Sequence, residues 1–121
     1  MPASKPDALQ LLDAAIDYLE RELSPTLSGY HRFQTRVTVN VLARVRRELA
    51  LSGPQSEAER ARLIALLGHP GDRDSLSREL ASRIRADDIP LDDPALLAHL
   101  RQSLVEALQI NNPRWLGEPG E

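Results

Sequence analysis

Aliphatic residues recur at three- and four-residue steps along almost the whole chain. The 121 residues include 21 leucines, whereas aromatic residues make up only 3%. Leucine and alanine favour helices, while β-rich domains depend on valine, threonine and aromatic side chains. The spacing therefore predicts an all-α protein, and short connections between helices favour an antiparallel helical bundle of about five helices.

The first two expected helices cover residues 7–23 and 30–51. Valines alternate with polar residues between 37 and 41, which fits a strand, but the length and the flanks of the segment favour a helix. Ser52-Gly53-Pro54 is expected to end the second helix. Each helix carries one apolar stripe that should face the core. The stripes consist of Leu9, Leu12, Ile16, Leu19 and Leu23 in the first helix, and of Phe33, Val37, Val41, Val45 and Leu49 in the second.

Local capping signals place three further helices. Ser56 and Glu59 predict a capping box for a third helix that runs to 67, with a left-handed cap at Gly68. A fourth helix should begin at an aspartate, Asp72 or Asp74. Asp93-Pro94 predicts the start of a fifth helix, which carries Leu97, Leu100, Leu104 and Leu108 and closes at 111–113.

The charges of the first two helices are opposite. Residues 7–23 hold five carboxylates and one arginine, a net charge of −4, and residues 30–51 hold five arginines and one glutamate, a net charge of +4. Because exposed ion pairs contribute only about 0.2–1 kcal/mol each, this asymmetry selects a packing partner more than it stabilises the fold.

Length and composition place the chain in a broad class. We expect a single helical domain over 1–121, with an ordered core over about 7–115 and the first, second and fifth helices as its body. The chain has no cysteine, a net charge of −3 and no apolar run long enough to span a membrane. These properties predict a cytoplasmic protein without a nucleic-acid or membrane partner.

The residues give no sign of catalysis. The three histidines lie in separate elements without the spacing of a metal motif, and the acidic pairs 87–88 and 92–93 fit a solvated loop and a helix cap better than a cation site. No phosphate-binding glycine loop and no nucleophile with an adjacent base is visible. We therefore expect no catalytic residue, no metal and no cofactor.

One polar arrangement on the second helix is a candidate binding site. Asn40 lies at the edge of the apolar stripe, with Arg36, Arg44 and Arg47 beside it, and such a group can bind a carboxylate or a phosphate or bond across a subunit interface. The alternative is structural: Arg44 and Glu48 form an ordinary ion pair one turn apart, and Asn40 bonds a neighbouring backbone group.

Four stretches together resemble a bacterial family of short helical proteins classed as a domain of unknown function. Members are typically encoded beside an aminoglycoside-phosphotransferase-like kinase and an acyl-CoA-dehydrogenase-like enzyme. The resemblance covers about 7–115 and adds Arg32, Asn112 and Arg114 to the candidate binding residues. The stretches are Arg32-Phe33-x-x-Arg36-Val37-x-x-Asn40-x-Leu42-x-x-Val45-x-Arg47-Glu48-Leu49, Leu80-Ala81-x-Arg83-Ile84-Arg85, Asp92-Asp93-Pro94-Ala95-Leu96-Leu97-x-His99-Leu100 and Asn112-Pro113-Arg114.

The resemblance implies a non-catalytic accessory subunit, the small partner of a hydroxyacyl-CoA kinase in hydroxy-acid breakdown. The acyl-CoA-dehydrogenase-like enzyme is a second candidate partner. The alternative function is a stand-alone module that binds a small ligand or acyl-CoA at the arginine-rich edge of the second helix. Apolar residues beyond the main stripes, Val39 and Ala43 in the second helix and Leu11 and Tyr18 in the first, further predict a homo-oligomer, with a dimer as the simplest form.

Overall fold

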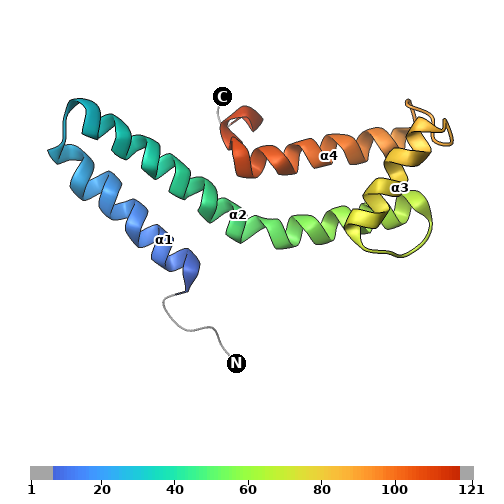
Figure 1. Ribbon diagram of the computed structural model, residues 1–121, viewed down its shortest axis with the longest axis horizontal. Helices are drawn as coiled ribbons and strands as arrows, with labels where there is room; N and C mark the ends of the chain where they lie inside the picture. The colour runs from blue at the N-terminus through green and yellow to red at the C-terminus, as the bar shows by residue number, and fades with distance from the viewer. Residues whose placement is uncertain (1–6, 118–121) are drawn as a thin grey trace. The chain divides into compact units, whose positions relative to one another are not determined.

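The computed structural model describes residues 7–117, and within that range every regular element is helical (Figure 1). The all-α prediction is therefore confirmed. Four α-helices are accompanied by short π-helical and 3-10 segments. In chain order the elements are α1 (Ala8–Asp17), a π-helical segment (Tyr18–Leu23), a 3-10 turn (Ser24–Thr26), α2 (Gly29–Leu67), α3 (Arg73–Arg85), α4 (Pro94–Asn111) and a last 3-10 segment (Pro113–Leu116).

Helix α2 is longer than the sequence predicts. It continues through Ser52-Gly53-Pro54 to Leu67, so the expected second and third helices are one helix of 39 residues. The predicted stop is wrong, and so is the predicted capping box, because Ser56 lies inside the helix. A helical proline costs about 3 kcal/mol and a glycine about 1 kcal/mol relative to alanine. Tertiary packing offsets this cost here, since Gln55 Nε2 donates to the carbonyl of Glu106 at 3.0 Å.

The other helix ends follow their local signals. Asp72 caps α3 by accepting from the amide of Ser75 at 2.9 Å, and Asp93 caps α4 by accepting from the amide of Leu96 at 2.9 Å. Gly68 has a φ of 82°, which is the left-handed cap expected after α2. These caps depend on two or three neighbouring residues, and the sequence locates them because no distant contact overrides the local signal, as it does at Ser56.

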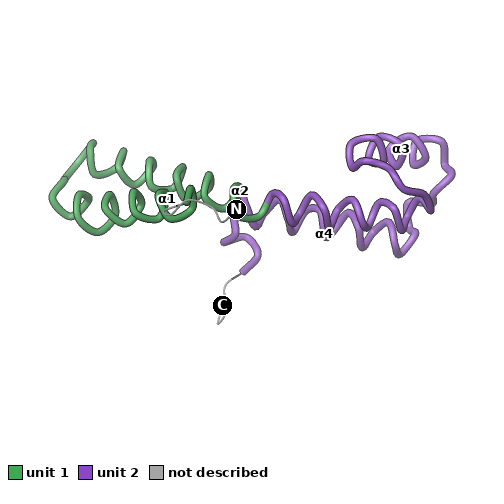
Figure 2. Tube along the Cα trace, turned by 90° about the horizontal axis from the view of Figure 1, so that it is seen from below, with its two compact units in different colours: residues 1–51 green, residues 52–121 purple. Residues whose placement is uncertain are grey.

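The chain forms two compact units, residues 1–51 and residues 52–121, and α2 runs through the boundary between them (Figure 2). The first, second and fifth expected helices do not form one unit, because the expected fifth helix is α4 and belongs to unit 2. The single-domain organisation stays a prediction.

Unit 1 is a pair of antiparallel helices, with α1 beside the first part of α2 (Figure 1). The apolar stripe of 7–23 is half-buried along this contact, and Val39 of α2 is buried. Arg46 of α2 binds Asp13 of α1 with two nitrogens, at 2.5 Å from Nε and 3.2 Å from Nη2. This fork confirms the charge pairing that the sequence predicts for these helices.

Unit 2 contains the aliphatic core. In it α4 runs antiparallel to the second part of α2, and α3 packs across them (Figure 1). Leucines from all three helices meet in the core, with Ile64, Leu66, Ile84 and Ile89 packed around them. The buried leucines are Leu63, Leu67, Leu76, Leu80 and Leu96.

Candidate functional site

The apolar stripe of α2, Phe33, Val37, Val41, Val45 and Leu49, lies on the surface and is named here the α2 stripe. Phe33 is 63% exposed and Val41 is 56% exposed. Helix α1 covers a different side of α2, where Val39 is buried and Leu42 and Ala43 are half-buried. The prediction that this stripe faces the core is therefore wrong. Helix α2 has two apolar sides, and α1 covers only one of them.

Helix α4 repeats this arrangement in unit 2. Leu97, Leu100 and Leu104, named here the α4 stripe, are exposed, and Leu104 is 67% exposed. The covered side of α4 instead carries Leu96, His99 and Glu106. The fully buried positions of α4 thus combine one leucine with two polar groups. Each unit thus presents an uncovered row of large apolar side chains.

The polar residues predicted to form a binding site are only partly brought together. Arg32, Arg36 and Asn40 line one pocket of about 240 Å³ in unit 1, together with Glu20 of the π-helical segment. Neither arginine forms an ion pair within residues 7–117. Two guanidinium groups and a side-chain amide are suited to an anionic group such as a carboxylate or a phosphate.

The remaining predicted residues lie elsewhere. Arg44 and Arg47 are further along α2 and do not line the pocket, although Arg47 does interact with another group. Asn112 and Arg114 belong to unit 2. There the backbone N–H of Asn112 donates to the carbonyl of Leu108 at 2.8 Å and closes α4. The predicted pair of Arg44 with Glu48 is absent from the ion pairs of residues 7–117.

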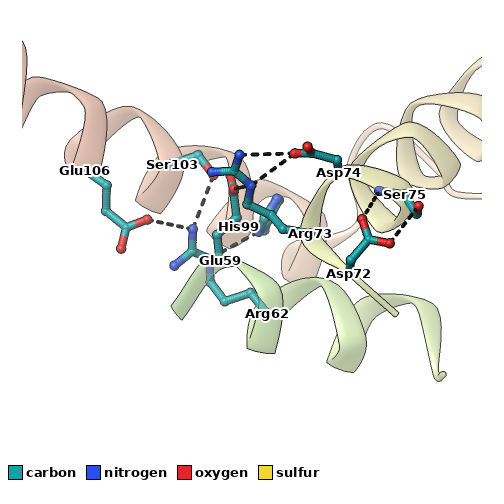
Figure 3. Close-up of polar contacts among 9 residues, drawn as sticks. All are labelled: Glu59, Arg62, Asp72, Arg73, Asp74, Ser75, His99, Ser103 and Glu106. Atoms are coloured by element: carbon teal, nitrogen blue, oxygen red, sulfur yellow. Dashed lines mark hydrogen bonds and ion pairs between the residues drawn. The ribbon is translucent and has the colours of Figure 1, made fainter. Parts of the chain in front are cut away.

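A polar cluster in unit 2 is the feature that the sequence reasoning missed. Arg62 of α2 donates from Nε to His99 Nδ1 at 3.1 Å and from Nη2 to Ser103 Oγ at 3.3 Å (Figure 3). The same Nη2 forms an ion pair with Glu106 Oε1 at 2.9 Å. His99, Ser103 and Glu106 follow Leu96 at steps of three and four residues. Polar residues at this spacing share one side of α4. On α2, Arg62 adjoins the apolar residues Leu63, Ile64, Leu66 and Leu67, which form the core. Polar groups placed on two core-facing sides are a signal that could have located the cluster.

Burial sets the protonation of this cluster. His99 is only 6% exposed. Its pKa is lowered, first because burial disfavours the charged imidazolium and second because the Arg62 guanidinium lies beside it. Neutral His99 can accept at Nδ1, and this is what its contact with Arg62 requires. The arginine in turn holds the Glu106 carboxylate, so the cluster consists of one ion pair and two neutral groups.

A groove borders the cluster between α2 and α4, with a volume of about 470 Å³. We name it the alanine groove, because small side chains from both helices form its apolar walls. The lining residues are Ala65, Leu66, Ala95 and Ala98, with the polar Arg62, His99 and Gln102.

Two further properties concern metal sites and membranes. No group of three potential metal-ligating side chains occurs in the part of the chain that the structure describes. Of the helices between residues 7 and 117, none has the length and apolar character needed to cross a membrane.

These features define a small all-α protein whose helices expose apolar rows beside polar clusters. A family described as a domain of unknown function (DUF6285) matches residues 25–115, and the chain belongs to this family. The expected membership in a family of unknown function is thereby confirmed, although the match begins after α1. Comparisons with curated proteins and with solved structures gave no match.

Proposed function

We propose that the protein is a non-catalytic accessory subunit that binds a partner protein through the α2 stripe. The observation that carries this proposal is the exposure of all five stripe residues on one continuous helix. Large contiguous apolar patches are uncommon on the surface of monomeric proteins and mark interaction sites when polar residues rim them. Five aliphatic and aromatic side chains at i, i+4 spacing suit a partner with a complementary apolar face.

The charged residues beside the α2 stripe indicate which charges the partner surface should carry. Arg36, Asn40 and Arg44 follow one another at four-residue steps along the edge of the α2 stripe. A partner that covers the stripe therefore needs carboxylates next to its own apolar residues, because arginine pairs with carboxylates in a two-pronged geometry. The expected partner face is apolar at its centre and acidic at one rim.

The identity of the partner comes from the family resemblance. It implies a kinase of the aminoglycoside-phosphotransferase type that acts on hydroxyacyl-CoA thioesters, with an acyl-CoA-dehydrogenase-like enzyme as the second candidate. In this role the protein works in the cytoplasm, where such thioesters are metabolised, and it supplies contacts to the enzyme rather than chemistry.

Calorimetry with the purified kinase from the same host tests the proposal. We expect saturable binding by the full chain and at least a tenfold weaker affinity for Val41→Glu, because the new carboxylate would face an apolar, acidic-rimmed surface. Leu11→Glu is the matched control, since Leu11 of α1 is 57% exposed but lies off the stripe. Equal binding by both variants, or no binding by the wild type, contradicts the proposal.

A second candidate function rests on the pocket lined by Arg32, Arg36 and Asn40. Its two arginines, without ion-pair partners within residues 7–117, favour a stand-alone module that binds an anionic small ligand or acyl-CoA. Calorimetry of the isolated chain with acyl-CoA separates the two functions, because an accessory subunit need not bind the thioester by itself. Loss of that binding in Arg36→Gln, with kinase binding retained, would assign the pocket to the ligand.

A further inference from the structure

The alanine groove ends at a polar atom that is available for bonding. His99 Nδ1 accepts a hydrogen bond from Arg62 Nε, so the proton of the neutral ring must lie on Nε2. Nε2 has no hydrogen-bond partner within residues 7–117. A donor on a largely buried ring is therefore unused.

The unused donor reaches the surface of the protein. Among the residues that the structure describes, no buried polar side-chain atom lacks a hydrogen-bond partner, so Nε2 must reach the surface. His99 is 6% exposed and lines the alanine groove. The accessible part of the side chain thus includes the Nε2–H group, and because His99 lines the groove, this is the donor that the groove can offer to a ligand.

The charges around the groove favour an uncharged ligand. Arg62 is the one charged residue in the lining, and its guanidinium already pairs with Glu106 at 2.9 Å. A second carboxylate would have to compete with Glu106 for Arg62, and any water it gave up against the apolar wall would cost it more free energy than it costs an uncharged oxygen. An acceptor oxygen without charge would bond Nε2 at much lower desolvation cost.

We propose that the alanine groove binds an uncharged aliphatic molecule that carries one hydrogen-bond-accepting oxygen, of the ketone or ester class. The oxygen accepts from His99 Nε2, and the aliphatic chain lies along Ala65, Ala95 and Ala98. Pockets for small organic ligands combine apolar walls with a few placed polar groups in this way. The site is separate from the α2 stripe, which lies in unit 1, and does not depend on the proposed protein partner.

Nuclear magnetic resonance of the full chain labelled at histidine nitrogen gives a direct test, with methyl pentyl ketone as the probe. We expect saturable binding that shifts the His99 Nε2 resonance. Hexanoate is an aliphatic chain of similar length whose charged head can accept the same hydrogen bond. We expect it to bind at least fivefold more weakly, because a carboxylate loses more hydration free energy than a ketone oxygen on binding. Equal or tighter binding of hexanoate would overturn the assignment to an uncharged ligand.

Two alanine variants locate the site. Ala98→Leu should narrow the groove and leave the contact between Arg62 and His99 in place. We expect it to weaken ketone binding at least tenfold, while the spectrum remains that of a folded protein. Ala81→Leu adds the same side chain at an exposed position of α3 outside the groove and should leave binding unchanged. Absence of ketone binding in the wild type, or equal effects of the two variants, would overturn the proposal.

Discussion

Arg62 joins α2 to the inner side of α4 through three separate acceptors. Its side chain is 23% exposed and that of Glu106 is 12% exposed, so the ion pair is largely withdrawn from water. The attraction between such charges roughly offsets their desolvation, and a buried ion pair therefore adds little net stability. Its importance is that either partner left alone would be a buried, uncompensated charge.

Removal of one charge should therefore destabilise the fold more than removal of both. We expect Glu106→Ala to lower the free energy of unfolding by about 3 kcal/mol, because Arg62 then keeps its charge without a carboxylate. The double variant Arg62→Met, Glu106→Met should lie within about 1.5 kcal/mol of the wild type. Urea unfolding monitored by circular dichroism measures both. A double variant as unstable as Glu106→Ala would contradict this account.

Two histidines should titrate on opposite sides of the usual histidine range. His69 Nε2 lies 2.8 Å from Glu79 Oε1, and this hydrogen bond is the main cause of its raised pKa. The pKa of His99 is lowered, chiefly by burial and then by Arg62, with Glu59 and Glu106 opposing. Histidine resonances followed against pH should therefore show His69 losing its proton at a higher pH than His99. The reverse order would contradict the two environments described.

The same shifts determine how stability depends on pH. The unfolded pKa of histidine is about 6.5. Because folding lowers the pKa of His99, its contribution is complete above that value and is lost as the pH falls through it toward the folded pKa. For His69 the sign is opposite: its contribution is present below that value and lost as the pH rises through the raised folded pKa. The free energy of unfolding should be measured at several pH values for His99→Phe and for His69→Gln. Each variant should lose only the pH dependence that belongs to its own histidine.

At the scale of elements, the sequence predicts local features and misses those that depend on distant contacts. The caps at Asp72 and Asp93 and the helical period are predicted correctly, because neighbouring residues determine them. The continuity of α2 is not, because contacts from Gln55 to α4 offset the local preference of Ser52-Gly53-Pro54 to end a helix. The covered side of α2 is also mistaken, since apolar spacing identifies an apolar side but not which helix packs on it.

Glycine positions in and after α2 give a test of its continuity. Gly53 lies inside the helix, and the space that an added methyl group would occupy is open, so we expect Gly53→Ala to raise the free energy of unfolding by about 0.5–1 kcal/mol. Gly68 has equally open space but a φ of 82°, and Gly68→Ala should be destabilising. Thermal unfolding of both variants compares them. A destabilising Gly53→Ala would indicate that α2 is not helical at this point.

At the scale of the whole molecule, the uncovered stripes bear on assembly. The homo-oligomer stays a prediction, but its expected interface changes. The sequence pattern assigns Val39 to a contact with a second copy, whereas in the structure Val39 is 7% exposed and packed within unit 1. The α2 stripe is the better candidate, because twofold pairing of identical apolar faces is the commonest route to a homodimer.

Light scattering over a dilution series should detect a dimer of the 13.5 kDa chain in the absence of other proteins. Val41→Glu should shift the molecule toward the monomer while its helix content is retained. Val39→Glu should instead reduce thermal stability, since it places a charge between α1 and α2. A wild type that is monomeric at every concentration would contradict the predicted dimer. If Val39→Glu dissociates the dimer without loss of stability, the interface lies on the side of α2 that carries Val39.

Pro54 has a consequence for the rate at which α2 exchanges its amide hydrogens with water. Proline has no amide hydrogen, so the carbonyl of Ala50 lacks the donor that an α-helix places four residues later. Opening this turn breaks fewer bonds than opening any neighbouring turn. Deuterium should therefore enter the amides of 51–53 ahead of those near the buried Leu63. Replacing Pro54 with alanine should slow that entry, because alanine supplies the hydrogen-bond donor that this turn of the helix interior lacks.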